Sequence, residues 1–225
     1  RKESSAASDV YKRQLSYNVI DLKVKYNINQ KEVLHMRDTY LRDILLDNPV
    51  IAAVRNDEEL SCALESDIEL IFVLYGTLLT ISKISEKLTR HHKKFFIHLD
   101  LIEGLKGDSE GIEFIKRSAN PLGIITTKPS NIRYANHLGL MSIQRIFIID
   151  SLSLKTGIAN INTVNPSAVE IMPGLCQKAI SIINKETSAS VIAGGLINSK
   201  NEVFECLSAG ALAVSTTEKK LWNDN

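Results

Sequence analysis

From residue 36 onward, the chain alternates short runs of Val, Ile, Leu and Phe with longer amphipathic segments. Between the runs, apolar residues recur at three- and four-residue spacing, as in Ile81, Ile84 and Leu88, which predicts helices. The runs themselves are nearly continuous rather than alternating with polar residues, which is typical of parallel strands covered on both faces. Eight such runs predict strands, at 50–55, 68–75, 94–100, 122–126, 141–149, 168–172, 190–193 and 211–215.

Eight strand–helix units in succession predict a compact α/β fold, a (β/α)8 barrel of the TIM type. Residues 218–222 are all that is left for the eighth helix, which is therefore expected to be short or missing. An extra N-terminal helix is predicted at 37–46, where it could cover the floor of the barrel or the seam beside the eighth strand. Asp57 and Ser199 are expected to cap helices. An open doubly wound sheet is the alternative fold.

The first 35 residues do not share this pattern. Residues 9–14 are what GAT GTG TAT AAG AGA CAG encodes, which resembles a transposon end used in sequencing libraries. Residues 31–33 can be encoded by a sequence that resembles a bacterial ribosome-binding site, at a suitable distance before Met36. Residues 1–35 are therefore interpreted as a non-native or disordered extension, and residues 36–225 as a single barrel domain. A genuine N-terminal arm is the alternative.

Composition excludes several classes of protein. Of the 225 residues, 44% are hydrophobic and 24% are charged, unlike a disordered or low-complexity chain. No apolar run approaches the roughly 18 residues of a membrane span. The three cysteines, Cys62, Cys176 and Cys206, have no CxxC spacing, which argues against disulfides and zinc and favours a cytoplasmic protein.

The net charge of the chain does not by itself indicate a nucleic acid or an anionic membrane as a partner. The formal net charge is +1, and residues 1–35 hold seven of the 27 basic and four of the 26 acidic residues. Without them the net charge is −2. Any contact with a polyanion must therefore come from a local patch.

The clearest functional pattern lies at the ends of the last two predicted strands. Gly194 and Gly195 follow the seventh strand, and Ser215 and Thr216 end the eighth. In phosphate-binding barrels these two loops form the anion site, because glycine lets the backbone approach a phosphate and hydroxyl groups add donors. The sequence therefore predicts a phosphate site at these four residues. A tight turn beside a polar strand end is the alternative.

Other polar residues and glycines fall at the same end of the barrel and complete a candidate pocket. Asp100 and Glu170 could meet there as a carboxylate pair for acid–base work or for a cation, with His98 on the same strand face as Asp100. A structural role at a strand end is the more ordinary interpretation, and no nucleophile, Schiff-base lysine or metal site is evident. The predicted pocket residues are Arg55, Asp100, Glu103, Gln144, Arg145, Glu170 and Gly174.

Basic residues gather in two places. Seven lie between Lys83 and Lys94, on the second helix and its exit, and are expected on a solvated face at the bottom rim. The others, Arg55, Lys128, Arg133 and Arg145, are expected around the top. Either group could contact RNA phosphates, although the chain has no RRM, KH or aromatic-platform signature.

Seven of these segments, in order, resemble the glycerol-3-phosphate-responsive antiterminator family, a resemblance that covers residues 38–222. The resemblance implies a non-enzymatic regulator of bacterial glycerol uptake operons, which binds glycerol 3-phosphate as its effector, has no cofactor and acts on leader mRNA. The segments are 48–55 (NPVIAAVR), 96–105 (FIHLDLIEGL), 123–128 (GIITTK), 143–151 (IQRIFIIDS), 169–174 (VEIMPG), 192–197 (IAGGLI) and 213–217 (AVSTT).

Two functions stay open at this point. In the first, the protein is an effector-sensing RNA-binding regulator: Asp100, Glu103 or Glu170 would hold the glycerol hydroxyls, and Lys128, Arg133 and Arg145 would contact RNA. In the second, it is a phosphate-binding barrel enzyme, an isomerase or lyase that acts on a small phosphorylated triose. The oligomeric state is left open.

Overall fold

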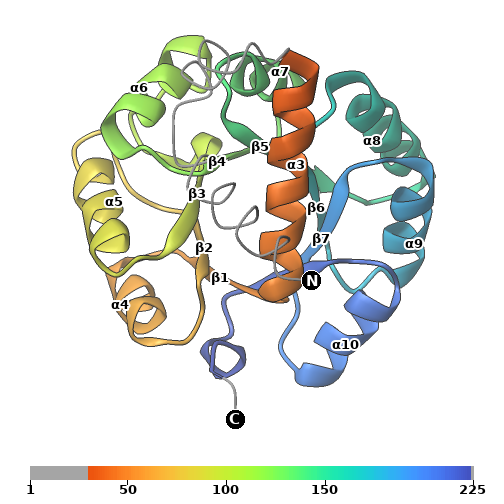
Figure 1. The fold of residues 1–225 in the computed structure, drawn as a ribbon. Coiled ribbons are helices and arrows are strands. Elements are labelled where there is room, and N and C mark those ends of the chain that lie inside the picture. Colours follow the sequence, from red (N-terminus) through yellow and green to blue (C-terminus); the bar gives the residue numbers. More distant parts are fainter. Residues whose placement is uncertain (1–29, 224–225) are drawn as a thin grey trace, which may run out of the picture.

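The computed structural model describes residues 30–223, which contain a closed barrel of eight parallel strands in sequential order (Figure 1). The predicted (β/α)8 barrel is thus confirmed, and the open sheet is excluded because β8 pairs with β1. The strands are β1 (Val50–Val54), β2 (Leu70–Val73), β3 (Lys94–His98), β4 (Gly123–Thr126), β5 (Met141–Phe147), β6 (Ala168–Met172), β7 (Ser190–Gly194) and β8 (Ala213–Thr216).

Helices surround the barrel in the predicted alternation. Two 3₁₀ turns add to them: η1 (Leu99–Leu101) directly after β3, and η2 (Lys219–Leu221) after β8 in place of a full eighth helix. No helix in the described range is long and apolar enough to cross a membrane. The α-helices are α3 (Gln30–Asp47), α4 (Asp57–Glu65), α5 (Ile81–Arg90), α6 (Ser109–Ala119), α7 (Pro129–His137), α8 (Ser151–Val164), α9 (Gln177–Glu186) and α10 (Lys200–Ser208).

One of the two predicted helix caps is shifted by one residue, and the other is confirmed. The cap of α4 is Asn56, whose side chain accepts from the backbone N–H of Glu59, whereas Asp57 is already the first helical residue; the prediction for Asp57 was one position late. Ser199 forms a capping box with Glu202, as predicted.

The extra N-terminal helix closes the floor of the barrel. Figure 1 shows α3 lying across the end at which the strands begin. Leu41, Ile44 and Leu45 are buried and pack on the lower interior side chains of the strands. Arg37, 3% exposed, donates hydrogen bonds to the Leu140 carbonyl and to the side chains of Asn136, at the end of α7, and Ser167, just before β6. The helix is longer than the predicted 37–46, and residues 1–29 lie outside the described range, so the expected start at Met36 stays a prediction.

The end of the chain seals the seam between β8 and β1. Trp222, directly after η2, is buried against residues of β1 and α4. Its indole Nε1 donates to the carbonyl of Thr216 at 3.1 Å. Trp222 and Leu221 of η2 therefore cover the outer surface between β8 and β1.

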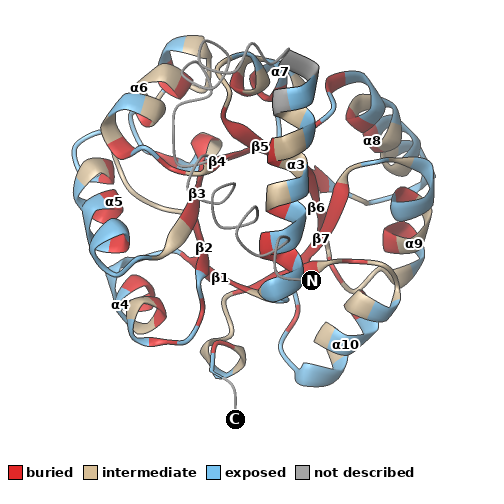
Figure 2. Ribbon diagram, viewed as in Figure 1, coloured by how far each residue is buried: buried red, intermediate tan, exposed pale blue. Residues whose placement is uncertain are grey.

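Alternation along each strand separates an interior layer from a helix-facing layer, and the strands are buried except at some of their end residues, of which Phe147 is exposed (Figure 2). On β5, Met141 and Ile143 belong to the interior cluster, whereas Ile146 packs with the helix-facing cluster. The same alternation points Arg145 into the barrel and Gln144 away from it. The interior is apolar near α3 and becomes polar only toward the carboxyl ends of the strands.

Candidate functional site

A buried ion pair lies inside the mouth of the barrel. Arg145 Nε donates to Glu170 Oε2 at 2.7 Å, and the two side chains are 9% and 0% exposed. Ser215 donates from Oγ to the other carboxylate oxygen, Oε1, at 2.6 Å. The structure thus brings together three residues of the predicted pocket and phosphate site, on β5, β6 and β8.

The guanidinium group of Arg145 has hydrogen-bond donors that no protein acceptor uses in the described part of the chain. Among residues 30–223, its two terminal nitrogens have no hydrogen-bond acceptor. Neither nitrogen is fully buried, so a ligand at the mouth can reach both of them. The arrangement therefore favours an anion at the mouth, next to the terminal nitrogens.

His98 lies on the interior face of β3 and is 2% exposed. Burial, together with the positive charge of Arg145, lowers the pKa of His98 to about 4. Its Nδ1 is buried without a hydrogen-bond partner in the described part of the chain. The imidazole is therefore neutral at pH 7 and cannot supply a second positive charge.

The predicted glycines form a tight turn against this network. A Cβ on Gly194 would lie 2.7 Å from both Glu170 Oε1 and Ser215 Oγ, so only glycine fits there. Gly195 has φ +76°, in the left-handed region that glycine adopts at no cost. Gly174 donates its N–H to the Gly194 carbonyl at 2.6 Å, and a Cβ on it would lie 2.9 Å from the Gly194 nitrogen. Gly174 therefore supports the turn from β6.

The two predicted hydroxyl donors are already in use. Ser215 donates to Glu170, and Thr216 donates from Oγ1 to the carbonyl of Ile197 at 2.7 Å. Each hydroxyl has a single proton to donate. Neither can donate to a phosphate unless it first gives up its present acceptor.

Asp100 lies away from the ion pair. The expectation that it shares a strand face with His98 is wrong, because β3 ends at His98 and Asp100 belongs to η1. Its Oδ2 accepts from Thr126 Oγ1 and from the N–H and Oγ1 of Thr127, while Oδ1 is 3.9 Å from Lys128 Nζ. The carboxylate thus shapes the turn after β4, and it does not pair with Glu170.

Arg55 and Glu103 line a separate groove of about 420 Å³ at the outer edge of β1 and β2, together with Tyr75, Lys83 and Lys87. Arg55 is turned toward α4, where it donates from Nη2 to Glu59 Oε1 at 2.6 Å. The placement of the whole basic cluster at the bottom rim is therefore wrong for two of its members.

Lys83 and Lys87 belong to that upper groove because α5 begins at the carboxyl end of the barrel. Lys93, at the exit of α5, does lie at the bottom. It donates to the carbonyls of Ser66 and Ile68 in the loop before β2, at 2.7 Å each.

The remaining predicted residues lie outside the barrel interior. Gln144 is on the helix-facing side of β5, and Lys128 and Arg133 are exposed at and within α7. Arg145, also predicted to contact RNA, is only 8% exposed and belongs to the ion pair instead of the rim. No group of three or more His, Cys, Asp or Glu side chains among the described residues could hold a metal ion.

The fold and this site define a (β/α)8-barrel protein with a buried ion pair at the mouth, where proteins of this architecture bind their ligands. The chain belongs to the glycerol-3-phosphate responsive antiterminator family, whose model matches residues 50–222. This confirms the resemblance inferred from the seven sequence segments.

Individual relatives agree with that membership. The crystal structure of the glycerol uptake operon antiterminator regulatory protein of Listeria monocytogenes is 32% identical, with a TM-score of 0.75 over 77% of this chain and 94% of that one. An antiterminator-related protein of Thermotoga maritima is 30% identical, with a TM-score of 0.71 over 78% and 98%. The uncharacterized protein YgcP of Escherichia coli (strain K12) is 37% identical over 182 residues, 81% of this chain and 95% of the relative.

Proposed function

We propose that this protein senses glycerol 3-phosphate at the mouth of the barrel and, in response, binds the leader mRNA of glycerol-utilisation operons in the cytoplasm. The observation that carries the proposal is the buried Arg145–Glu170 pair, whose cation has unused donors. Membership of a family described as glycerol-3-phosphate responsive antiterminators supports this choice of ligand and of regulatory role. In this role the protein performs no catalysis.

The effector competes with Glu170 for the cation. A phosphate next to the terminal nitrogens of Arg145 would add a second anion beside a carboxylate that already uses both of its oxygens. The glycerol hydroxyls can then take over contacts that Ser215 now makes with Glu170. Such a ligand stabilises a rearranged mouth, which is the differential binding that a switch requires.

Isothermal calorimetry with glycerol 3-phosphate tests the effector site. Arg145→Met alone leaves the Glu170 carboxylate buried and unpaired, so the double variant Arg145→Met, Glu170→Met is the better probe of the cation. Because hydrogen bonds to charged groups contribute about 1.5–3 kcal/mol, binding is expected to weaken by roughly 10- to 150-fold. Unchanged affinity for glycerol 3-phosphate would show that the phosphate does not bind at this mouth.

The glycine turn is tested by Gly195→Asp, with Gly195→Ala as its matched control. Both variants strain the backbone at φ +76°, and a Cβ there would meet Met172 at 2.8 Å. Only the aspartate adds a negative charge next to the phosphate. Loss of binding in Gly195→Asp with binding retained in Gly195→Ala assigns the turn to the phosphate; equal affinities in the two variants contradict that assignment.

RNA binding is tested by a gel shift of leader RNA with and without glycerol 3-phosphate. The proposal expects the two affinities to differ. If the effector leaves RNA affinity unchanged, effector-controlled RNA binding is excluded for this chain.

Turnover assays with triose phosphates test the alternative, an isomerase or lyase. Its specific support is a buried carboxylate and a neutral imidazole at one mouth. Against it, both oxygens of Glu170 are engaged by Arg145 and Ser215, which leaves no oriented base. Turnover that disappears in Glu170→Gln would overturn the non-enzymatic assignment.

A further inference from the structure

His98 is a buried imidazole on the wall of the barrel mouth that neither the ion pair nor the glycine turn uses. It is the last residue of β3 and shares the interior face of that strand with Phe96. Because the eight strands follow one another around a closed barrel, β3 lies opposite β7, the strand that ends at Gly194. His98 therefore faces the glycine turn across the mouth.

The ring of His98 makes no hydrogen bond to another residue in the described part of the chain. Its Nδ1 is fully buried without a partner, whereas Nε2 is not fully buried and is the nitrogen that a molecule in the mouth can reach. The side chain as a whole is only 2% exposed. Since buried polar groups in proteins are nearly always hydrogen-bonded, an unpaired and reachable nitrogen at this depth indicates a contact for a ligand.

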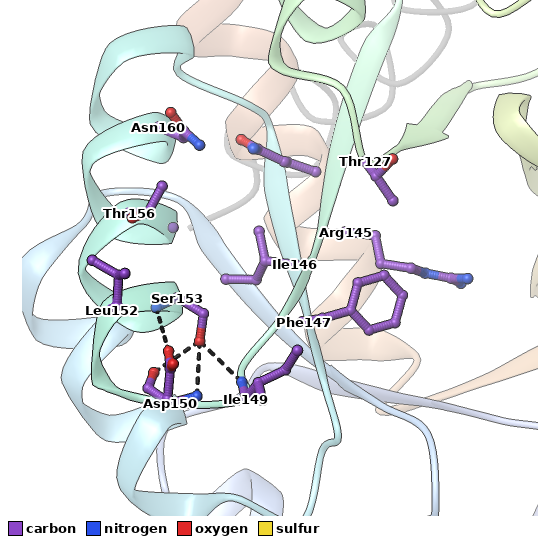
Figure 3. Close-up of a pocket in the computed structure, with 12 residues that line it drawn as sticks. Thr127, Arg145, Ile146, Phe147, Ile149, Asp150, Leu152, Ser153, Thr156 and Asn160 are labelled. Carbon is purple, nitrogen blue, oxygen red and sulfur yellow. Dashed lines mark hydrogen bonds between the residues drawn. The ribbon is translucent and has the colours of Figure 1, made fainter.

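The charged groups that act on His98 are Arg145 and Asp100. Figure 3 shows Arg145 and Phe147 pointing to the side of β5 that faces away from α8, which is the side of the mouth. Burial and the charge of Arg145 lower the pKa of His98, and the charge of Asp100 raises it less. The Asp100 carboxylate is held by hydrogen bonds from the turn after β4. The mouth therefore offers a ligand one cation and one neutral imidazole.

These two groups suit different parts of a phosphorylated ligand. A guanidinium group hydrogen bonds most strongly to an anion, which assigns the phosphate to Arg145. A neutral imidazole has one donor and one acceptor nitrogen, and a hydroxyl group both donates and accepts, so Nε2 can hydrogen bond to a hydroxyl in either tautomer. Below His98 the wall is apolar, because the rings of Phe72 and Phe96 meet edge to face with their centroids 5.9 Å apart.

We propose that His98 is a specificity-determining residue of the effector site, where its Nε2 hydrogen bonds to a hydroxyl group of glycerol 3-phosphate. The inference rests on the effector function proposed above and deepens it. The phosphate lies beside Arg145 and the glycine turn, and the glycerol part extends across the mouth toward β3. Phosphates that lack this hydroxyl group therefore bind more weakly than the effector.

Calorimetry with a matched set of ligands tests the contact. Two analogues, 3-hydroxypropyl phosphate and 2-hydroxypropyl phosphate, each lack one of the two hydroxyl groups of glycerol 3-phosphate. His98→Leu removes both ring nitrogens at similar volume, and its melting temperature should stay equal or rise because the unsatisfied Nδ1 disappears. This variant is expected to bind glycerol 3-phosphate about tenfold more weakly, because the ligand hydroxyl loses its partner.

Comparing the ligands separates a direct contact from a structural defect. Wild type is expected to prefer glycerol 3-phosphate over one of the two analogues by about tenfold, and His98→Leu should lose this preference. Affinity for inorganic phosphate, measured by competition, should be equal in the two proteins. His98→Gln is the conservative variant, because its amide keeps a donor and an acceptor, and it should restore most of the preference.

Three outcomes overturn the inference. If wild type binds glycerol 3-phosphate and His98→Leu keeps the same affinity and preference, the hydroxyl groups bind elsewhere and the proposed function survives. If His98→Leu weakens inorganic phosphate and both analogues as much as it weakens the effector, His98 contacts the phosphate or supports the fold, and it does not read a hydroxyl group. If wild type does not bind glycerol 3-phosphate at all, the inference and the effector half of the proposed function fail together.

Discussion

Arg145 and Glu170 are each ordinary strand residues in sequence, and their pairing depends on two independent facts. Strand alternation points both side chains into the barrel, and the β5–β6 register places them directly opposite each other. A position at the end of a strand can be predicted from an apolar run. The face on which the side chain points depends on the strand boundary to within one residue.

That one-residue dependence explains which site predictions changed. Asp100 was placed on β3, but the strand ends two residues earlier and the carboxylate turns toward Thr126 and Thr127. Gln144 faces the helices because it is next to Arg145, and neighbouring residues of a strand point to opposite faces. The alternation of β5 can be predicted from the sequence. The direction of Arg55 toward Glu59 depends on where α4 starts, and the predicted cap was one residue late.

His98 predicts a pH dependence of stability. Its pKa is lowered from an ordinary 6.5 to about 4 by burial and by Arg145, so the unfolded chain binds more protons than the folded one between these values. Stability should therefore fall as the pH falls from about 6.5 to about 4, by up to about 3 kcal/mol from this residue alone. Urea denaturation at several pH values, for wild type and His98→Gln, checks this. Equal slopes for the two proteins in this window would show that His98 is not the cause.

At the scale of elements, the eighth βα unit ends in η2 and one tryptophan. The sequence predicted a short or missing last helix from chain length, and it left two roles open for the N-terminal helix. Length alone could not decide between floor and seam, because both surfaces are apolar. The packing of Leu41 and Leu45 on the lower barrel interior assigns α3 to the floor, and Trp222 takes the seam.

Trp222 is therefore expected to contribute strongly to stability. Trp222→Ala removes a side chain that is 2% exposed and leaves a cavity between β1, α4 and β8, which costs about 3–5 kcal/mol. Trp222→Phe keeps most of the apolar contact and loses the hydrogen bond to Thr216, so about 1–2 kcal/mol is expected. Chemical denaturation measures both. A cost below about 1 kcal/mol for Trp222→Ala would mean that the seam is closed by other residues.

A chain that begins at Met36 is expected to keep the stability of the full chain. The buried contacts of α3 described above begin at Arg37, and Leu41, Ile44 and Leu45 are all retained. A chain that begins at Val50 lacks the whole floor and should melt far lower. Thermal melts of the three chains decide the matter; a drop of several degrees in the first truncation would show that the preceding residues pack.

At the scale of the whole molecule, the barrel separates two surfaces that a regulator needs. The mouth is small and buried, and the surfaces around α7 and α8 are open and carry exposed cations. The sequence predicted that both lie at the carboxyl ends of the strands. It could not separate interior from rim, because Arg145 and Lys128 have the same charge and both lie toward the carboxyl end of a predicted strand.

Charge distribution leads to the last prediction. Residues 36–225 have a net charge of −2, so RNA affinity must depend on a few local cations, and Lys128 is an exposed one at the start of α7. Its Nζ is 3.9 Å from Asp100 and its side chain is 53% exposed. Lys128→Ala should weaken RNA binding and lower the slope of log affinity against log salt by roughly 0.7, the value for one phosphate contact on a single strand. Glycerol 3-phosphate affinity should be nearly unchanged.

The basic helix α5 provides the control for this prediction. Lys87 and Arg90 both lie on α5, which Figure 1 shows on the opposite side of the barrel from α8. Lys87→Ala and Arg90→Ala should therefore change the salt slope little. If these two substitutions weaken RNA binding and Lys128→Ala does not, the RNA docks on the α5 flank, beside the groove of Arg55 and Glu103. The salt titration thus discriminates between the two sides of one barrel, because each lost phosphate contact changes the slope by a known amount wherever on the surface it is made.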